Sequence, residues 1–199
     1  IFDRDWADYR SAVASLIERG FSAFRLNNLS HFELFEDLDG LSIITGYRLF
    51  TLNSQAGMAW RELGADETTL YIEDDRENLR HLLPRQWGCE KNLTIYGSVP
   101  LITSRIRHRG LRPGSRLQSD RGDGYRVDQR AGLSVLTSAT DFSLLDRLDE
   151  LRQLGCQRFV IDLAHLGPFS PQGRQILDAL KRGHGVSGTS PFNFEAGME

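Results

Sequence analysis

The sequence has few cysteines. Only two, Cys89 and Cys156, occur in 199 residues, so a tetrahedral zinc site made of cysteine alone is excluded by number. Two isolated thiols in a chain of this length are typical of a reducing compartment, which predicts a cytoplasmic protein. Because Cys156 follows a glycine and precedes an apolar stretch, we expect a buried structural thiol at this position.

Long apolar runs and metal-binding spacings are also missing. No apolar segment approaches the ~20 residues of a bilayer-spanning helix, and no secretory signal pattern is present. The five histidines show no HExxH spacing, and no serine lies in a GxSxG elbow. The net charge of -3 is no general signature of nucleic-acid or membrane binding. We therefore expect neither DNA nor a membrane as a partner, and no cofactor within this chain.

The first hundred residues alternate between helical and strand-like patterns. Apolar spacing predicts helices over Trp6–Ile17 and Ser54–Leu63, the second closed by Gly64. The expected strands are Phe21–Leu26, Leu41–Thr45, Arg48–Leu52, Thr68–Ile72 and Leu93–Tyr96. This order predicts an α/β fold with parallel strands and helical crossovers. A barrel and an open doubly wound sheet both fit, and with so few strands a barrel would be a partial (β/α) barrel-like segment.

The pattern changes after residue 104. The stretch "SDRGDGYRV" at 119–127 predicts a β-hairpin, and 133–137 adds a strand. A helix is expected over 141–154, a strand over 158–163, and a last helix between Pro171 and Gly183. We therefore expect late β/α units in residues 1–104 and an α/β extension in residues 105–199. The extension holds a basic loop, the hairpin, two helices and an irregular tail.

Polar clusters end two successive expected strands. They comprise Asn53 and Ser54 after the first, and Glu73, Asp74 and Asp75 after the second. Helix capping accounts for Ser54, Asp74 and Asp75, because short polar side chains accept from free amides of a first helical turn. The carboxyl ends of parallel strands are also where ligands bind. Asn53 and Glu73 are open to either interpretation.

A run of arginines follows the last of these strands. Arg105, Arg107, Arg109, Arg112 and Arg116 occur with His108 within "RIRHRGLRPGSR". Guanidinium groups bind phosphate and carboxylate bidentately, which indicates RNA or an anionic substrate. The alternative is a solvated loop whose charges pair with acidic neighbours. The absence of interleaved aromatic residues weakens the RNA interpretation.

The order of short motifs resembles a known family. "NNLSHF" is followed by "LFTLNSQAGMAWRELGADETTLYIED" and then by "LTIYGSVPLITSR". This is similar to the collagenase-like peptidases of unassigned catalytic type, peptidase family U-thirty-two, and "DGYRV", "LLDRLDELRQLGCQRFVIDLA" and "GTSPFNFEAGME" extend the resemblance over nearly the whole chain. The matching residues are Asn28, Leu29, Leu52, Asn53, Ser54, Glu62, Leu63, Gly64, Glu73, Tyr96, Gly97, Pro100 and Leu101.

The resemblance implies a C-terminal fragment of a longer peptidase, a hydrolase that is inactive as a fragment and has its remaining N-terminal part as a partner. The first residue, Ile1, is not methionine, which fits this expectation. Some members of the family are implicated in hydroxylation of RNA or of quinone precursors, some with an iron-sulfur cluster. This sequence has Tyr71-Ile72 before Glu73 where the family has Ser-Pro, Ile102 for a methionine, and Arg107 near the place of a usual cysteine. An iron-sulfur cluster or metal is therefore not expected in this fragment, and its presence in the full-length protein is left open.

Four residues are candidates for the site. Glu73 would act as a general base or as a ligand for a water or metal. Asn53 and Tyr96 would orient the substrate, a peptide, and Arg105 would bind an anion. Two other functions stay open: the substrate-binding part of an RNA-modifying protein of the hydroxylation type, and a structural or interaction domain.

Overall fold

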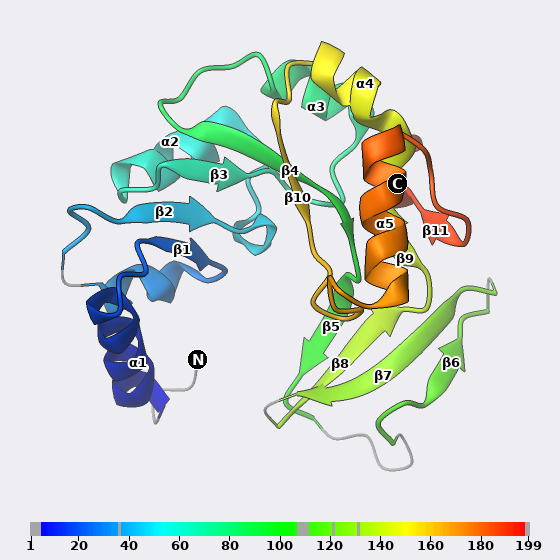
Figure 1. Ribbon diagram of the computed structural model, residues 1–199, viewed down its shortest axis with the longest axis horizontal. Helices are drawn as coiled ribbons and strands as arrows, with labels where there is room; N and C mark the ends of the chain where they lie inside the picture. The colour runs from blue at the N-terminus through cyan, green and yellow to red at the C-terminus, as the bar shows by residue number, and fades with distance from the viewer. Residues whose placement is uncertain (1–4, 36, 107–111, 121, 131, 198–199) are drawn as a thin grey trace. The chain divides into compact units, whose positions relative to one another are not determined.

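The structure is a computed structural model with a mixed α/β fold, which confirms the predicted fold class (Figure 1). It describes residues 5–35, 37–106, 112–120, 122–130 and 132–197. The chain forms two compact units: unit 1 consists of residues 1–94, 153–159 and 193–199, and unit 2 of residues 95–152 and 160–192. Both units combine segments that are distant in sequence. The expected division between residues 104 and 105 stays a prediction.

Unit 1 is built around parallel strands in the order β1-β2-β3-β4. The registers align Ala23 with Ser42, Ile44 with Glu67, and Glu67 with Glu90. The elements are α1 (Trp6–Glu18), β1 (Ala23–Leu26), η2 (Leu29–Leu34), β2 (Ser42–Thr45), η3 (Tyr47–Leu49), α2 (Ser54–Glu62), β3 (Glu67–Thr69), α3 (Arg76–Leu82) and the start of β4 (Glu90–Gly97). Among the described residues of this unit no pairing joins β1 to β4, so a barrel is not shown.

The core of unit 1 explains why its elements form where they do. Ile43, Leu70 and Leu93 are almost fully buried, and they belong to successive extended segments, as expected for a sheet covered by helices. Helix α2 approaches Trp87 so closely that a Cβ on Gly57 would lie 2.6 Å from the indole ring. Glycine is therefore required at this position of the helix despite its low helix propensity.

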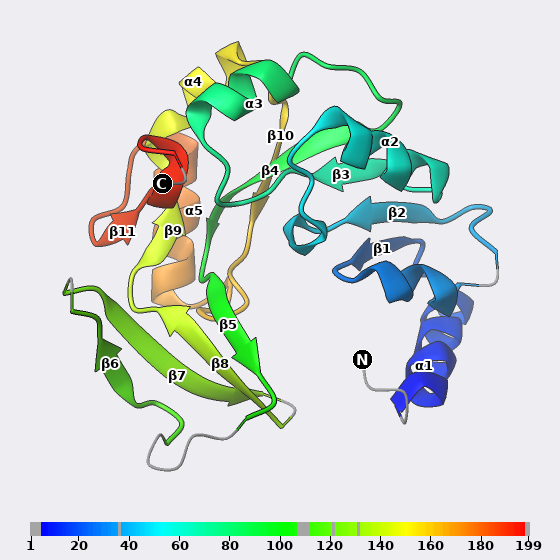
Figure 2. The same cartoon turned by 180° about the vertical axis from the view of Figure 1, so that it is seen from behind.

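Unit 2 contains a small antiparallel sheet with the strand order β5-β8-β7-β6, which Figure 2 shows from behind. In addition, the end of β4 pairs antiparallel with β9, and β9 pairs parallel with β11. The elements are β5 (Pro100–Ser104), β6 (Arg116–Gln118), β7 (Gly124–Arg130), β8 (Leu133–Ser138), β9 (Asp141–Ser143), η4 (Leu145–Arg147), α4 (Leu148–Gln153), β10 (Arg158–Ile161), α5 (Pro171–Arg182), β11 (Thr189–Ser190) and η5 (Phe192–Phe194), of which α4, β10 and η5 extend into unit 1.

Two local predictions in unit 2 are confirmed. The strands β6 and β7 form the expected hairpin, with Gln118 opposite Gly124. Helix α5 begins with Pro171 and ends at Gly183, which adopts a left-handed conformation with φ 65°. The Ser170 hydroxyl accepts from the Gly173 amide at 2.9 Å and caps the helix start.

Two predicted elements are wrong. The helix expected over 141–154 begins only at residue 148, because residues 141–143 form β9 and place Phe142 opposite Gly97 in β4. The strand expected over 48–52 is instead η3 followed by an isolated bridge between Thr51 and Leu70. At 141–143 pairing with a distant strand overrides the local pattern, whereas at 48–52 the left-handed backbone of Phe50 interrupts the extended segment. None of the described helices is long and apolar enough to cross a bilayer.

Candidate functional site

Asn53 lies at the start of α2 and caps this helix. Its Oδ1 accepts from the Ala56 amide at 2.9 Å, and its side chain is otherwise exposed. Ser54, which was expected to be the cap, is the first residue of the helix. Asn53 therefore takes the structural role that the sequence assigned to its neighbour, and its proposed role in orienting substrate stays a prediction.

The acidic pair at the start of α3 is also used structurally. Asp75 is the N-cap and accepts from the Asn78 amide at 2.8 Å. Asp74 is buried, and both of its carboxylate oxygens accept from the Asn78 side chain at 2.9 Å. Asn78 also donates to the carbonyl of Leu52. Burial raises the pKa of Asp74 to about 6, although the hydrogen bond from Asn78 opposes the shift.

Glu73 belongs to a small aromatic cluster. Its Oε1 accepts from the Tyr71 hydroxyl at 3.1 Å, and the Tyr71 ring packs on Phe50 with 5.0 Å between the ring centroids. Burial and the neighbouring Glu73 carboxylate raise the pKa of Tyr71 to about 12. Phe50 has a left-handed backbone with φ 54° and is 59% exposed, a strained arrangement of a kind found at ligand-binding positions. The bridge between Thr51 and Leu70 places Asn53 and Glu73 after neighbouring extended segments, and a concave surface shared by both stays a prediction.

Tyr96 makes the most specific contacts of the four candidates. The residue is buried in β4, and its hydroxyl donates to Asp141 Oδ2 at 2.7 Å. Nε2 of His165 lies 2.9 Å from the same oxygen, and the imidazole stacks on the Tyr96 ring with 6.2 Å between centroids. We call Tyr96, Asp141 and His165 the Tyr–Asp–His cluster. It lies entirely within unit 2.

The backbone holds these three side chains in place. Tyr96 lies opposite Ser143 in the antiparallel pair of β4 and β9, and Asp141 begins β9. The chain leaves β10 with the Asp162 amide donating to the Tyr96 carbonyl at 2.9 Å. Asp162 Oδ1 then accepts from the Ala164 amide, which forms the turn that carries His165. The site is therefore built on rigid strand ends and a hydrogen-bonded turn.

Gly97 allows the close approach of this turn. A Cβ at Gly97 would lie 3.2 Å from Cβ of Asp162, closer than a larger side chain accommodates without movement. The glycine that matched the family motif therefore has a physical role beside the cluster.

The cluster has the arrangement of a carboxylate-oriented histidine. The side chains of His165 and Asp141 are 12% and 24% exposed, so both are shielded but reachable by water. Asp141 Oδ2 accepts from Nε2–H, which leaves the Nδ1 lone pair available, and within the described part of the chain Nδ1 has no hydrogen-bond partner. Burial, followed by the hydrogen bond to Asp141, raises the pKa of Tyr96. Tyr96 therefore stays a neutral donor that holds Asp141.

Sequence reasoning did not find Asp141 or His165. Asp141 was expected at the start of a helix, and His165 was considered only for metal spacings. The residues are separated from their partners by 45 and 24 positions, so no local motif joins them. The one available signal was Tyr96, which the family resemblance selected.

Arg105 follows β5 and is exposed. Arg107, His108 and Arg109 lie outside the described residues. Arg112 and Arg116 are exposed, and neither side chain has an ion-pair partner among the described residues. For these two arginines, the structure shows no pairing with an acidic neighbour within the residues that it describes.

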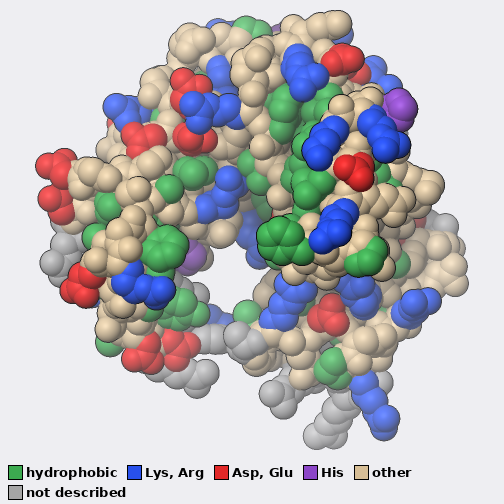
Figure 3. Space-filling model, viewed as in Figure 1, with side chains coloured by type: hydrophobic (Ala, Val, Ile, Leu, Met, Phe, Trp, Pro, Cys, Tyr) green, Lys and Arg blue, Asp and Glu red, His purple; other side chains and the backbone are tan. Residues whose placement is uncertain are grey.

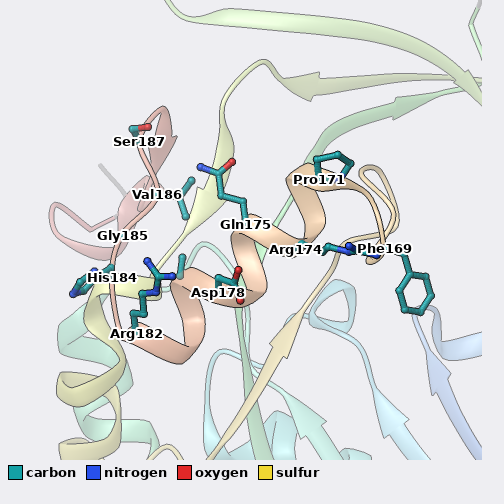
Figure 4. Close-up of a pocket in the computed structure, with 11 residues that line it drawn as sticks. Phe169, Pro171, Arg174, Gln175, Asp178, Arg182, His184, Gly185, Val186 and Ser187 are labelled. Atoms are coloured by element: carbon teal, nitrogen blue, oxygen red, sulfur yellow. The ribbon is translucent and has the colours of Figure 1, made fainter.

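A groove lies along α5, and Figure 4 shows its lining. It has a volume of about 860 Å³ and lies between the helix and the segment 184–187. Figure 3 shows Lys and Arg side chains gathered over α5. The groove is thus a basic surface that the sequence did not indicate.

The described residues contain no group of three or more His, Cys, Asp and Glu side chains that could hold a metal ion. Cys89 and Cys156 are both buried free thiols, and burial raises the pKa of Cys156 to about 11. The thiol at position 156 is therefore protonated, and its predicted burial is confirmed.

Comparisons with family models, with curated proteins and with solved structures find no match to this chain. The resemblance to the collagenase-like peptidases stays a prediction that rests on its motifs.

Proposed function

We propose that this chain carries the general-base centre of a hydrolase, with His165 as the base. The observation that supports it is the Tyr–Asp–His cluster, in which one carboxylate oxygen accepts from both Tyr96 and His165. A histidine oriented by a carboxylate is a common arrangement for proton transfer in hydrolysis. The family resemblance adds the substrate class, which is a peptide.

The chemistry follows from the two ring nitrogens. With Nε2–H held by Asp141, Nδ1 accepts a proton from a water molecule as its oxygen attacks the substrate carbonyl. The Asp141 carboxylate stabilises the imidazolium that results. The protonated ring then returns the proton to the leaving amine. Tyr96 is a positioning residue that acts through Asp141. This role replaces the direct contact with substrate that is expected for Tyr96 from the sequence.

Glu73 is the alternative general base or water ligand. Its Oε1 is held by Tyr71, and Oε2 has no hydrogen-bond partner in the described residues. Asn53 and Arg105 keep their proposed roles in orienting substrate and binding an anion. We also place the protein in the cytoplasm, a proposal supported by the two free thiols.

The test is hydrolysis of a peptide library by a longer gene product that contains this chain, as the wild type and as the variants His165→Gln, Asp141→Asn and Tyr96→Phe. The first two variants are expected to lose about 10²- to 10⁴-fold in kcat/KM. Tyr96→Phe should lose less and shift the pH profile of kcat, because it changes only the environment of Asp141. The matched control is His81→Gln, since His81 is an exposed histidine in unit 1. Equal activity of His165→Gln and the wild type would refute the assignment.

The chain alone and any longer gene product that contains it are assayed side by side. The resemblance predicts that the chain alone does not cleave peptides. The chain alone could instead cleave peptides in a reaction that Glu73→Gln abolishes and His165→Gln leaves intact. That result would show that Glu73, and not His165, is the general base. A complete lack of cleavage by every form would refute the proposed hydrolase activity.

RNA binding is the second candidate function. It is favoured by Arg112 and Arg116, which are exposed and have no ion-pair partner among the described residues. If the arginine run binds RNA, affinity falls steeply with salt through counterion release. Charge reversal at Arg107 and Arg109 should weaken binding further. A flat salt response in a filter-binding titration, or no binding in low salt, would leave the solvated-loop interpretation.

A further inference from the structure

Helix α5 presents two chemically different faces. Gly173 and Ile176 are buried, and Gly173 lies close against the backbone of Gly167. The opposite face carries Arg174, Asp178 and Arg182, which recur every four residues and so form one stripe along the helix. This stripe is one wall of the groove.

The two arginines lie at opposite ends of the groove. Figure 4 shows Arg182 beside His184 at one end and Arg174 extending toward Phe169 at the other, with Asp178 between them. Phe169 is 84% exposed, so it offers an apolar surface beside Arg174. The groove therefore has a basic end, an acidic centre and a basic end bordered by an aromatic ring.

The charges at the two ends are not neutralised within the described part of the chain. Neither Arg174 nor Arg182 has an ion-pair or side-chain hydrogen-bond partner there, whereas Asp178 lies 3.8 Å from Nζ of the exposed Lys181. Unpaired guanidiniums in a groove are suited to carboxylate ligands, which they bind bidentately. The pattern of charge is thus complementary to a ligand that is acidic at both ends and neutral or basic at its centre.

We propose that this α5 groove binds an extended peptide with the pattern acidic-x-basic-x-acidic. Four helical residues span about 6 Å, so Arg174, Asp178 and Arg182 follow one another at intervals of about 6 Å. Alternate residues of an extended strand lie on one side and are about 6.6 Å apart. Three alternate side chains of such a peptide therefore match the three groove charges in register.

The same pattern disfavours a nucleic-acid strand. A nucleic acid carries a phosphate on every nucleotide, and the strand would bring one of them against Asp178. One exposed aromatic at the end of the groove also provides no series of stacking positions. The peptide interpretation is independent of the proposed hydrolase, because the groove shares no residue with the Tyr–Asp–His cluster.

The test is fluorescence anisotropy with a labelled peptide that contains Glu-Ala-Lys-Ala-Glu. Comparison peptides carry Glu-Lys-Glu, Glu-Ala-Glu-Ala-Glu, or alanine at all three positions, and a single-stranded RNA serves as the competing probe. The first peptide should bind best. Arg174→Ala and Arg182→Ala should each weaken its binding about fivefold. Arg130→Ala, which removes an exposed charge from β7 in the same unit, should leave it unchanged.

A charge reversal at the centre sharpens the test. Asp178→Lys should reverse the preference, so that the peptide with a central Glu binds better than the peptide with a central Lys. All the substituted side chains are exposed, and circular dichroism melts verify that the variants fold. The proposal is overturned by lack of saturable binding at about 1 mM peptide, by equal binding of the compressed Glu-Lys-Glu pattern, by an equal loss with Arg130→Ala, or by tighter binding of RNA.

Discussion

The polar cluster at the strand ends of unit 1 and the Tyr–Asp–His cluster of unit 2 satisfy their hydrogen bonds in different ways. In unit 1, Asn53 and Asp75 accept from amides three residues further along the chain. In unit 2, Asp141 accepts from Tyr96 and His165, which come from other elements. The first cluster is conspicuous in the sequence and is largely used to start helices. The second has no sequence motif and brings together groups that can transfer a proton.

This difference shows how proximity in sequence misleads a search for sites. Short polar residues that follow a strand are close to the free amides of the next helix, and capping those amides satisfies them. Side chains from distant segments have no such local partner and meet only in the folded chain. A polar network that is shielded from water is destabilised when one member is lost.

The largest expected change in stability is in unit 2. Asp141→Ala leaves the buried Tyr96 hydroxyl and the His165 Nε2–H without an acceptor and should cost about 3 kcal/mol. Tyr96→Phe removes only one donor and should cost about 1 kcal/mol. Urea denaturation followed by circular dichroism measures both, and hydrogen exchange of the β9 amides localises the effect. Equal costs for the two variants would contradict a shared acceptor.

A smaller, pH-dependent effect is expected from Asp74 in unit 1. Its pKa is raised from 3.8 to about 6, so the folded state holds the proton more tightly than the unfolded state between these values. The free energy of unfolding therefore falls as pH rises through this window. Asp74→Asn removes the titration. The free energy of unfolding of this variant, relative to that of the wild type, should therefore be about 2 kcal/mol higher at pH 7 than at pH 4. Identical pH profiles for the two proteins would show that folding does not raise the pKa of Asp74. Asp75→Asn is the matched control.

The smallest effects separate capping from function at the strand ends of unit 1. Asp75→Ala should cost about 1 kcal/mol, because the Asn78 amide loses its cap. Glu73→Gln keeps an acceptor for Tyr71 and should change stability by less than about 0.5 kcal/mol, although it would affect any ligand bound at that edge. Thermal melts of both variants give the comparison. A large loss of stability in Glu73→Gln would make this residue structural.

Much of the fold was predictable where local rules decide it. Pro171 and Gly183 delimit α5 because proline fits a first helical turn and glycine adopts the left-handed conformation. The Asp-Gly turn led to the β6–β7 hairpin. At the start of α2 the kind of interaction was right and the residue was one position off, because Asn53 caps the helix instead of Ser54. At the start of α3 the expected cap Asp75 is confirmed, while Asp74 is buried.

The sequence by itself determined the α/β alternation, the hairpin, the limits of the last helix and the burial of Cys156, because each depends on backbone preference or on apolar periodicity within a few residues. Only the tertiary structure decided that residues 141–143 form a strand, since the pairing with β4 outweighs a helical pattern. It also decided the Tyr–Asp–His cluster and the charges of the α5 groove. Those depend on which side chains meet across tens of residues, and a side chain's partners are chosen by packing and by the cost of burying an unsatisfied polar group.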